Sequence, residues 1–148
     1  MVVKRWLARL PALFGALAVI CAGLVGLSSP ASAALPTCNY QSQYWHPVYS
    51  NYYYFRPTTD WNNNDTNCRL AYGNQAFGVK ALQDSLRSCY NQNIAVDGIF
   101  GTQTRQAVIN VQNFHHLTSD GVFGPATSNA MVWPKYNYSG GGLVGCWF

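Results

Sequence analysis

The sequence predicts a mainly α chain: a small three-helix domain between an aromatic-rich, largely irregular extension with possible short strands and a disulfide-tied C-terminal tail. Three observations predict it. Apolar side chains recur at helical spacing in residues 77–90, a loop-plus-helix pattern occurs twice in residues 96–131, and residues 35–72 show no helical period. We therefore expect a signal peptide (1–33), a Tyr/Trp-rich extension (34–72), the helical domain (73–133) and a Gly-rich tail that docks through Cys146 (134–148).

The repeated pattern consists of Val96–Val108 and, 23 residues later, Ser119–Met131. A self-match at a fixed period indicates a repeated structural unit. In each copy an Asp-Gly pair favours a turn, a Phe needs burial, and a second Gly precedes a helix. We expect these helices to begin at about Thr102 and Pro125, since proline suits the first helical position. The predicted structural loop residues are Asp97, Gly98, Phe100, Gly101, Asp120, Gly121, Phe123 and Gly124.

The first helix of the domain is expected at Phe77–Tyr90, where Val79, Leu82, Leu86 and Cys89 form one apolar stripe. In the helix after the first loop, the stripe consists of Thr104, Ala107, Val108 and Val111. Three such faces can close on one small core.

Residues 73–133 resemble the peptidoglycan-binding-like domain of bacterial wall proteins, through the Val79–Gln83 run, the two Asp-Gly-x-Phe-Gly loops and Val111-Gln112. The resemblance implies a three-helix fold that binds wall polymer and catalyses nothing. Where the family usually has Phe, Gly and Trp, this chain has Val111, His116 and Ser128. We expect His116 to adopt the helix-end conformation that glycine adopts more easily.

Residues 1–33 have the features of a secretory signal: basic residues, an apolar run and an Ala-Ser-Ala site, with cleavage expected after Ala33. A membrane anchor is the alternative, but the apolar run is short for a spanning helix, so we expect no stable membrane insertion after signal removal. Cleavage removes three of the nine basic residues, leaving six against five Asp and a net charge of +1. That balance argues against a nucleic-acid partner.

Four cysteines remain after cleavage, and an even number in an exported chain predicts two disulfides. Four cysteines allow three connectivities. We expect Cys68–Cys89 as a local clip beside the first helix and Cys38–Cys146 as a link between the two tails; the other pairings stay open.

Aromatic residues crowd the extension, among them Tyr40, Trp61 and the run Tyr52–Phe55, which is compatible with a strand or hairpin arm. Two interpretations compete. The rings pack over the helical core, which we favour, or they form a platform for sugar rings.

No catalytic constellation is evident, so we expect no enzymatic activity, no cofactor and no metal site. The adjacent His115 and His116 diverge on a helix and cannot share an ion. Asp97 and Asp120 are explained as turn formers, which leaves Asp60 and Asp65 as uncommitted acids near aromatic residues.

The predicted function is a secreted, extracellular or wall-associated, non-catalytic bacterial module that binds peptidoglycan through its glycan or stem peptide. Alternatives are a protein-interaction module with a wall-associated partner and a small wall hydrolase. We expect the ligand in a groove between the first repeat loop and the following helix, where Arg105 faces stem-peptide carboxylates unless it is only a solvated surface charge. The candidate ligand-binding residues are Tyr90, Gln103, Arg105, Asn110, Gln112, Asn113 and Trp133.

Overall fold

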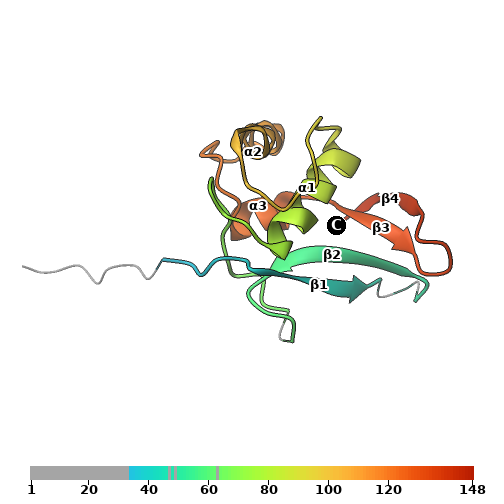
Figure 1. Cartoon of the computed structure of the whole chain (residues 1–148). Helices are drawn as coiled ribbons and strands as arrows, with labels where there is room; N and C mark the ends of the chain where they lie inside the picture. The colour runs from blue at the N-terminus through green and yellow to red at the C-terminus, as the bar shows by residue number, and fades with distance from the viewer. Residues whose placement is uncertain (1–33, 47, 49, 63) are drawn as a thin grey trace, which may run out of the picture. The chain divides into compact units, whose positions relative to one another are not determined.

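The structure is a computed structural model that describes residues 34–46, 48, 50–62 and 64–148. The predicted signal peptide lies outside the described residues. The described part contains three helices and a four-stranded sheet (Figure 1). In chain order these are β1 (Tyr40–Trp45), β2 (Tyr52–Thr58), α1 (Phe77–Tyr90), α2 (Thr102–Phe114), α3 (Pro125–Ala130), β3 (Trp133–Asn137) and β4 (Leu143–Trp147).

The three predicted helices are confirmed, with the expected starts at Thr102 and Pro125. Gly101 and Gly124 are their N-caps, and Pro125 occupies the first turn of α3. His116 has a positive φ of 56°, as expected for the helix-end conformation. Local sequence chemistry therefore determines the helix boundaries.

The mainly α expectation needs correction, because both ends of the described chain form strands. The sheet order is β1-β2-β3-β4, with every neighbouring pair antiparallel. The extension supplies the β1–β2 hairpin, and the segment predicted as a docked, Gly-rich tail supplies nearly all of the β3–β4 hairpin. Tyr52 and Tyr53 pair with Asn137 and Tyr136, which joins the two hairpins into one sheet.

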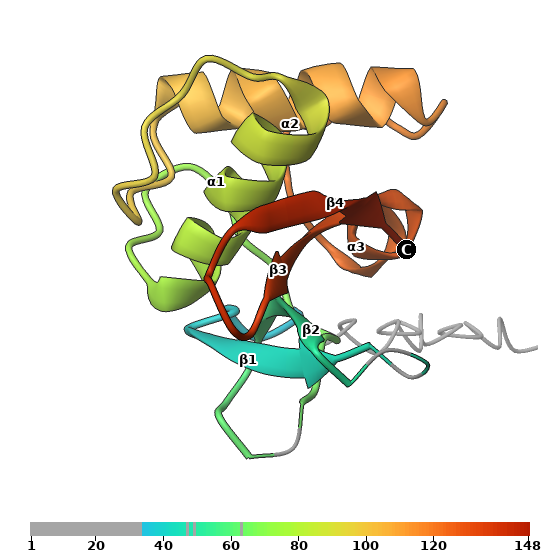
Figure 2. The same cartoon turned by 90° about the vertical axis from the view of Figure 1, so that its right-hand side faces the viewer.

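Helix α1 lies between α2 and the sheet (Figure 2). Its stripe of Val79, Leu82 and Leu86 is fully buried. The two loop phenylalanines, Phe100 and Phe123, are buried as well. Among the described residues, no helix has the length and apolar character needed to cross a membrane.

The disulfides differ from the expected pairing: Cys38 is bonded to Cys68, and Cys89 to Cys146. The predicted Cys68–Cys89 and Cys38–Cys146 pairs are therefore wrong. Cys38 reaches Cys68 because its N–H donates to the Arg69 carbonyl at 3.1 Å, and Cys89 reaches Cys146 because the sheet packs against α1. Neither contact follows from sequence separation.

Candidate functional site

The two repeat loops are each held by a buried glutamine from the preceding helix. Gln83 Nε2 donates to Asp97 Oδ1 at 2.8 Å, and its Oε1 accepts from the Gly98 N–H at 2.8 Å. Gln112 makes the same bonds to Asp120 and Gly121, at 2.8 and 2.9 Å. The repeat therefore includes a glutamine as well as its Asp-Gly turn.

Each glutamine also reaches the next helix, where Gln83 Nε2 lies 3.1 Å from Thr104 Oγ1 and Gln112 Nε2 lies 3.2 Å from Thr127 Oγ1. Hydrogen bonds from the Ile99 N–H and the Gln83 amide lower the pKa of Asp97. Because the Asp97 carboxylate already accepts these bonds, it acts in the structure as a turn former.

Two of the candidate ligand residues are buried and do not reach the surface. Gln112 is 2% exposed and its amide is occupied by the second loop, while Trp133 is 1% exposed and packs against Phe123. Both assignments to a ligand site are corrected on this ground. Trp133 was expected at the end of the helical domain, but it begins strand β3, which places its ring in the core.

The other candidates lie apart from one another. Tyr90 and Asn110 line one groove, and Gln103 lines a small hollow on the outer side of the first loop. Arg105 lies across the second loop, with Nη2 3.2 Å from the Asp120 carbonyl oxygen, and Asn113 accepts a hydrogen bond from Ser119. The structure does not gather the predicted set into one site.

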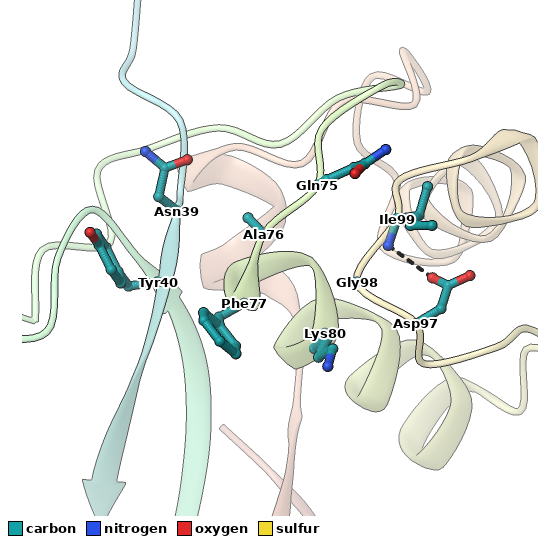
Figure 3. Close-up of a pocket in the computed structure, with 9 residues that line it drawn as sticks. All are labelled: Asn39, Tyr40, Gln75, Ala76, Phe77, Lys80, Asp97, Gly98 and Ile99. Carbon is teal, nitrogen blue, oxygen red and sulfur yellow. Dashed lines mark hydrogen bonds between the residues drawn. The ribbon is translucent and has the colours of Figure 1, made fainter.

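A different groove lies where the extension meets the start of α1 and the first loop, with a volume of about 560 Å³ (Figure 3). Figure 3 shows residues of the extension on one side, the start of α1 at the base and the first loop on the other side. We call it the aromatic groove; its lining residues are Asn39, Tyr40, Gln75, Ala76, Phe77, Lys80, Asp97, Gly98 and Ile99.

Three rings cluster at this groove. The Trp61 ring centroid lies 5.3 Å from that of Tyr40 and 5.9 Å from that of Phe77. Trp61 is 57% exposed and Phe77 50% exposed, so these rings do not merely fill the core. Lys80 Nζ lies 5.8 Å from the Phe77 ring centroid, which places one cation over the cluster.

Gly78 explains why the extension comes so close to α1. A Cβ atom at this position would collide with the Cys38 carbonyl oxygen, so only glycine permits the approach. The first residues of β1 are thereby brought beside Phe77. The Phe77-Gly78 pair at the helix start was the available sequence signal for this contact, and sequence reasoning missed it.

A second groove of about 590 Å³ lies between α1, α2 and Phe148. Tyr90 closes its inner end: its hydroxyl lies 2.8 Å from His115 Nε2 and accepts from the Val132 N–H at 2.8 Å. Burial raises the pKa of Tyr90. Beside it, Asn110 Nδ2 donates to Gln92 Oε1, so the polar groups of this groove already bond one another.

The carboxylates are dispersed over the described residues. Asp97 and Asp120 hold the turns, Asp84 accepts from the Tyr136 hydroxyl at 2.7 Å, and Asp60 and Asp65 lie in the loop after β2. Within the part of the chain that the structure describes, no three His, Cys, Asp or Glu side chains gather closely enough to hold a metal ion.

Comparison with known families matches residues 77–131 to the family model described as "Putative peptidoglycan binding domain". Residues 77–131 form a peptidoglycan-binding domain. The predicted resemblance is confirmed, and the aromatic groove lies where the extension meets this domain. No curated protein matches the chain.

Three solved structures are similar to the chain. A peptidoglycan-binding protein from Clostridioides difficile, in complex with glutamine hydroxamate, has 26% identity and a TM-score of 0.46 over 60% of this chain and 54% of its own. A fused Zn-dependent amidase/peptidase/peptidoglycan-binding domain-containing protein from Clostridium acetobutylicum has 34% identity and a TM-score of 0.40, over 41% of this chain and 27% of its own. The SleB N-terminal domain has 34% identity and a TM-score of 0.40, over 43% of this chain and 86% of its own. The chain thus spans about half of the first protein and about a quarter of the second.

Proposed function

We propose that this chain is a secreted, non-catalytic module that holds bacterial peptidoglycan and that the aromatic groove grips the glycan. The observation that carries the site is the ring cluster of half-buried Tyr40 with exposed Trp61 and Phe77, which lies beside a peptidoglycan-binding domain. The two disulfides support export, because such bonds persist in oxidising surroundings.

The groove has the groups that sugar recognition needs. Aromatic faces pack against the C–H faces of sugar rings, and the side-chain amides of Asn39 and Gln75 line the same groove and can bond hydroxyl and acetamido groups. A weak site is sufficient on a repeating polymer, since rebinding and linkage to another module both raise retention.

Co-sedimentation with purified peptidoglycan sacculi tests the site. Each of Trp61→Ala and Phe77→Ala is expected to weaken binding roughly tenfold, because a lost ring contact removes about 1.5 kcal/mol. Phe114→Ala is the matched control: Phe114 is 71% exposed and lines the second groove. Equal losses for all three variants, or no loss for the first two, would reject the aromatic groove.

The non-catalytic assignment needs its own measurement. Sacculi incubated with residues 34–148 should release no soluble muropeptides and no new reducing ends, while the protein itself sediments. Release of fragments would identify a wall hydrolase instead, and the search for its acids would begin at Asp60 and Asp65.

A protein-interaction role is the second candidate, favoured by two exposed rings, one at the end of β1 and one just after β3. Trp45 is 50% exposed, and its ring lies 5.5 Å from that of Tyr138, which is 69% exposed. Aromatic pairs of this kind often anchor protein interfaces. Retention of a purified wall protein by the wild type, lost in Trp45→Ala without loss of sacculus binding, would support this second role.

A further inference from the structure

Strand β3 carries a lysine that the fold buries. Lys135 is 1% exposed. Its side chain makes no hydrogen bond or ion pair within the described residues, which include all five Asp carboxylates of the chain. Buried lysines are rare unless a partner compensates the charge, so this ammonium group needs an explanation.

The contacts of Lys135 are aromatic. Its Nζ lies 3.4 Å from the centroid of the Tyr54 ring on β2, a cation–π contact. On the other side Lys135 pairs with Gly145 of β4, and a Cβ atom there would lie 2.6 Å from the Trp147 ring. Glycine therefore lets the Trp147 ring lie over β4 beside the lysine.

A pocket of about 270 Å³ opens at this lysine, lined by His46, Tyr52, Lys135 and Trp147. His46 directly follows β1 and Tyr52 begins β2, and the His46 N–H donates to the Tyr52 carbonyl at 2.9 Å. Trp147 is 45% exposed and forms the outer wall. The pocket thus combines apolar rings with one cation at its inner end.

The electrostatics suit an anion. Burial and the nearby Arg56 lower the pKa of Lys135 to about 8, so the amine is still mainly protonated at neutral pH. Arg56 has contacts outside this pocket: Nη2 donates to Ser128 Oγ at 2.8 Å and the guanidinium lies 5.3 Å from the Trp133 ring centroid, while its buried Nε has no hydrogen-bond partner among the described residues. An anion entering the pocket would meet the Lys135 ammonium group, whose close contact in the structure is the Tyr54 ring and not a carboxylate.

We propose that this pocket binds the carboxylate of an amino acid or short peptide, with Lys135 as the anchor and the Trp147 ring packing on the aliphatic part. The volume favours a small ligand, since it equals that of roughly nine water molecules at about 30 Å³ each. Identification of the ligand as a wall stem-peptide end rests on the proposed function. The pocket lies outside the matched residues 77–131, so it adds a contact to whatever that domain supplies.

The chain offers a direct readout, because residues 34–148 contain two lysines, Lys80 and Lys135. Protein labelled with ¹³C and ¹⁵N at lysine gives two side-chain Cε signals. Titration with acetyl-alanyl-alanine should shift the Lys135 signal saturably and leave the exposed Lys80 signal in place. The C-terminal amide of the same peptide should shift neither. An unmoved Lys135 signal, or an equal response to inorganic phosphate, would overturn the carboxylate assignment.

Sacculus binding separates this proposal from the proposed function. Lys135→Met keeps an apolar chain of similar length and should weaken co-sedimentation at least fivefold, whereas Arg87→Met, on the exposed side of α1, should not. If the peptide shifts Lys135 but wild type fails to sediment, the pocket stands and the wall-binding proposal fails. If wild type and Lys135→Met sediment equally and no peptide shifts the lysine, the pocket proposal is overturned alone.

Discussion

The paired glutamines make the energetics of the repeat testable. Gln83 and Gln112 each use two amide hydrogens and one carbonyl oxygen to bond a loop and the next helix. A net contribution of about 1 kcal/mol per hydrogen bond gives about 3 kcal/mol for each glutamine. Methionine fills nearly the same volume and can make none of these bonds, so Gln83→Met and Gln112→Met should each lose about that free energy of unfolding.

The assay is urea unfolding of residues 34–148, with both disulfides intact, followed by far-ultraviolet circular dichroism. Gln103→Met, on the exposed face of α2, is the matched control and should stay within about 0.5 kcal/mol of wild type. Similar losses at Gln83 and Gln112 are expected because their hydrogen bonds correspond one to one. If either variant loses less than about 1 kcal/mol of its free energy of unfolding, the hydrogen bonds of these amides do not stabilise the fold as argued.

Three further outcomes follow from other parts of the fold. Lys135 has a pKa of about 8 in the folded protein, below its ordinary value of 10.5, so between these pH values the unfolded chain binds one more proton at this lysine than the folded chain does. The free energy of unfolding should therefore rise by up to about 2 kcal/mol from pH 8 to 10. Urea unfolding measured over this pH range should show the rise in wild type and not in Lys135→Met. The lowered pKa of Asp97 contributes stability that is lost as pH falls through the folded value, so Asp97→Asn should flatten the acid limb of the same curve; an unchanged limb would contradict this. Gly78→Ala forces a collision with the Cys38 carbonyl and should lower stability by more than about 2 kcal/mol, whereas Gly101→Ala, where a Cβ meets nothing within 4 Å, should change thermal unfolding little.

The helices were predictable because their determinants are local. The apolar stripe of α1, the glycine N-caps and Pro125 lie within a few residues of the boundaries that they set. The sheet depends on contacts between distant segments: β2 pairs with β3, although the whole helical domain separates them along the chain. The disulfide error has the same origin, because the true partners meet only after the two hairpins have packed on α1.

The candidate site was predicted less well than the fold. Polar residues of α2 were assigned to the ligand, yet Gln112 stands four residues after Val108 and so shares its buried face. The groove that the structure presents instead combines Tyr40 with Phe77, which come from different segments. Composition alone indicated that the extension was rich in rings; only the close approach at Gly78 shows which rings meet the domain.

The pairing of β2 with β3 has a consequence for how the chain assembles during synthesis. The first hairpin emerges from the ribosome early, but the β2 edge stays open until β3 has been made, because no earlier strand of the described chain covers it. The helical repeat can form from neighbouring segments in the meantime, while the aromatic hairpin remains exposed to pairing with other nascent chains. Strands β3 and β4, which are synthesised last, therefore cover the open edge of the β1–β2 hairpin, which is synthesised first. Deletion of β3 and β4 should leave an aggregation-prone hairpin and not a smaller folded protein.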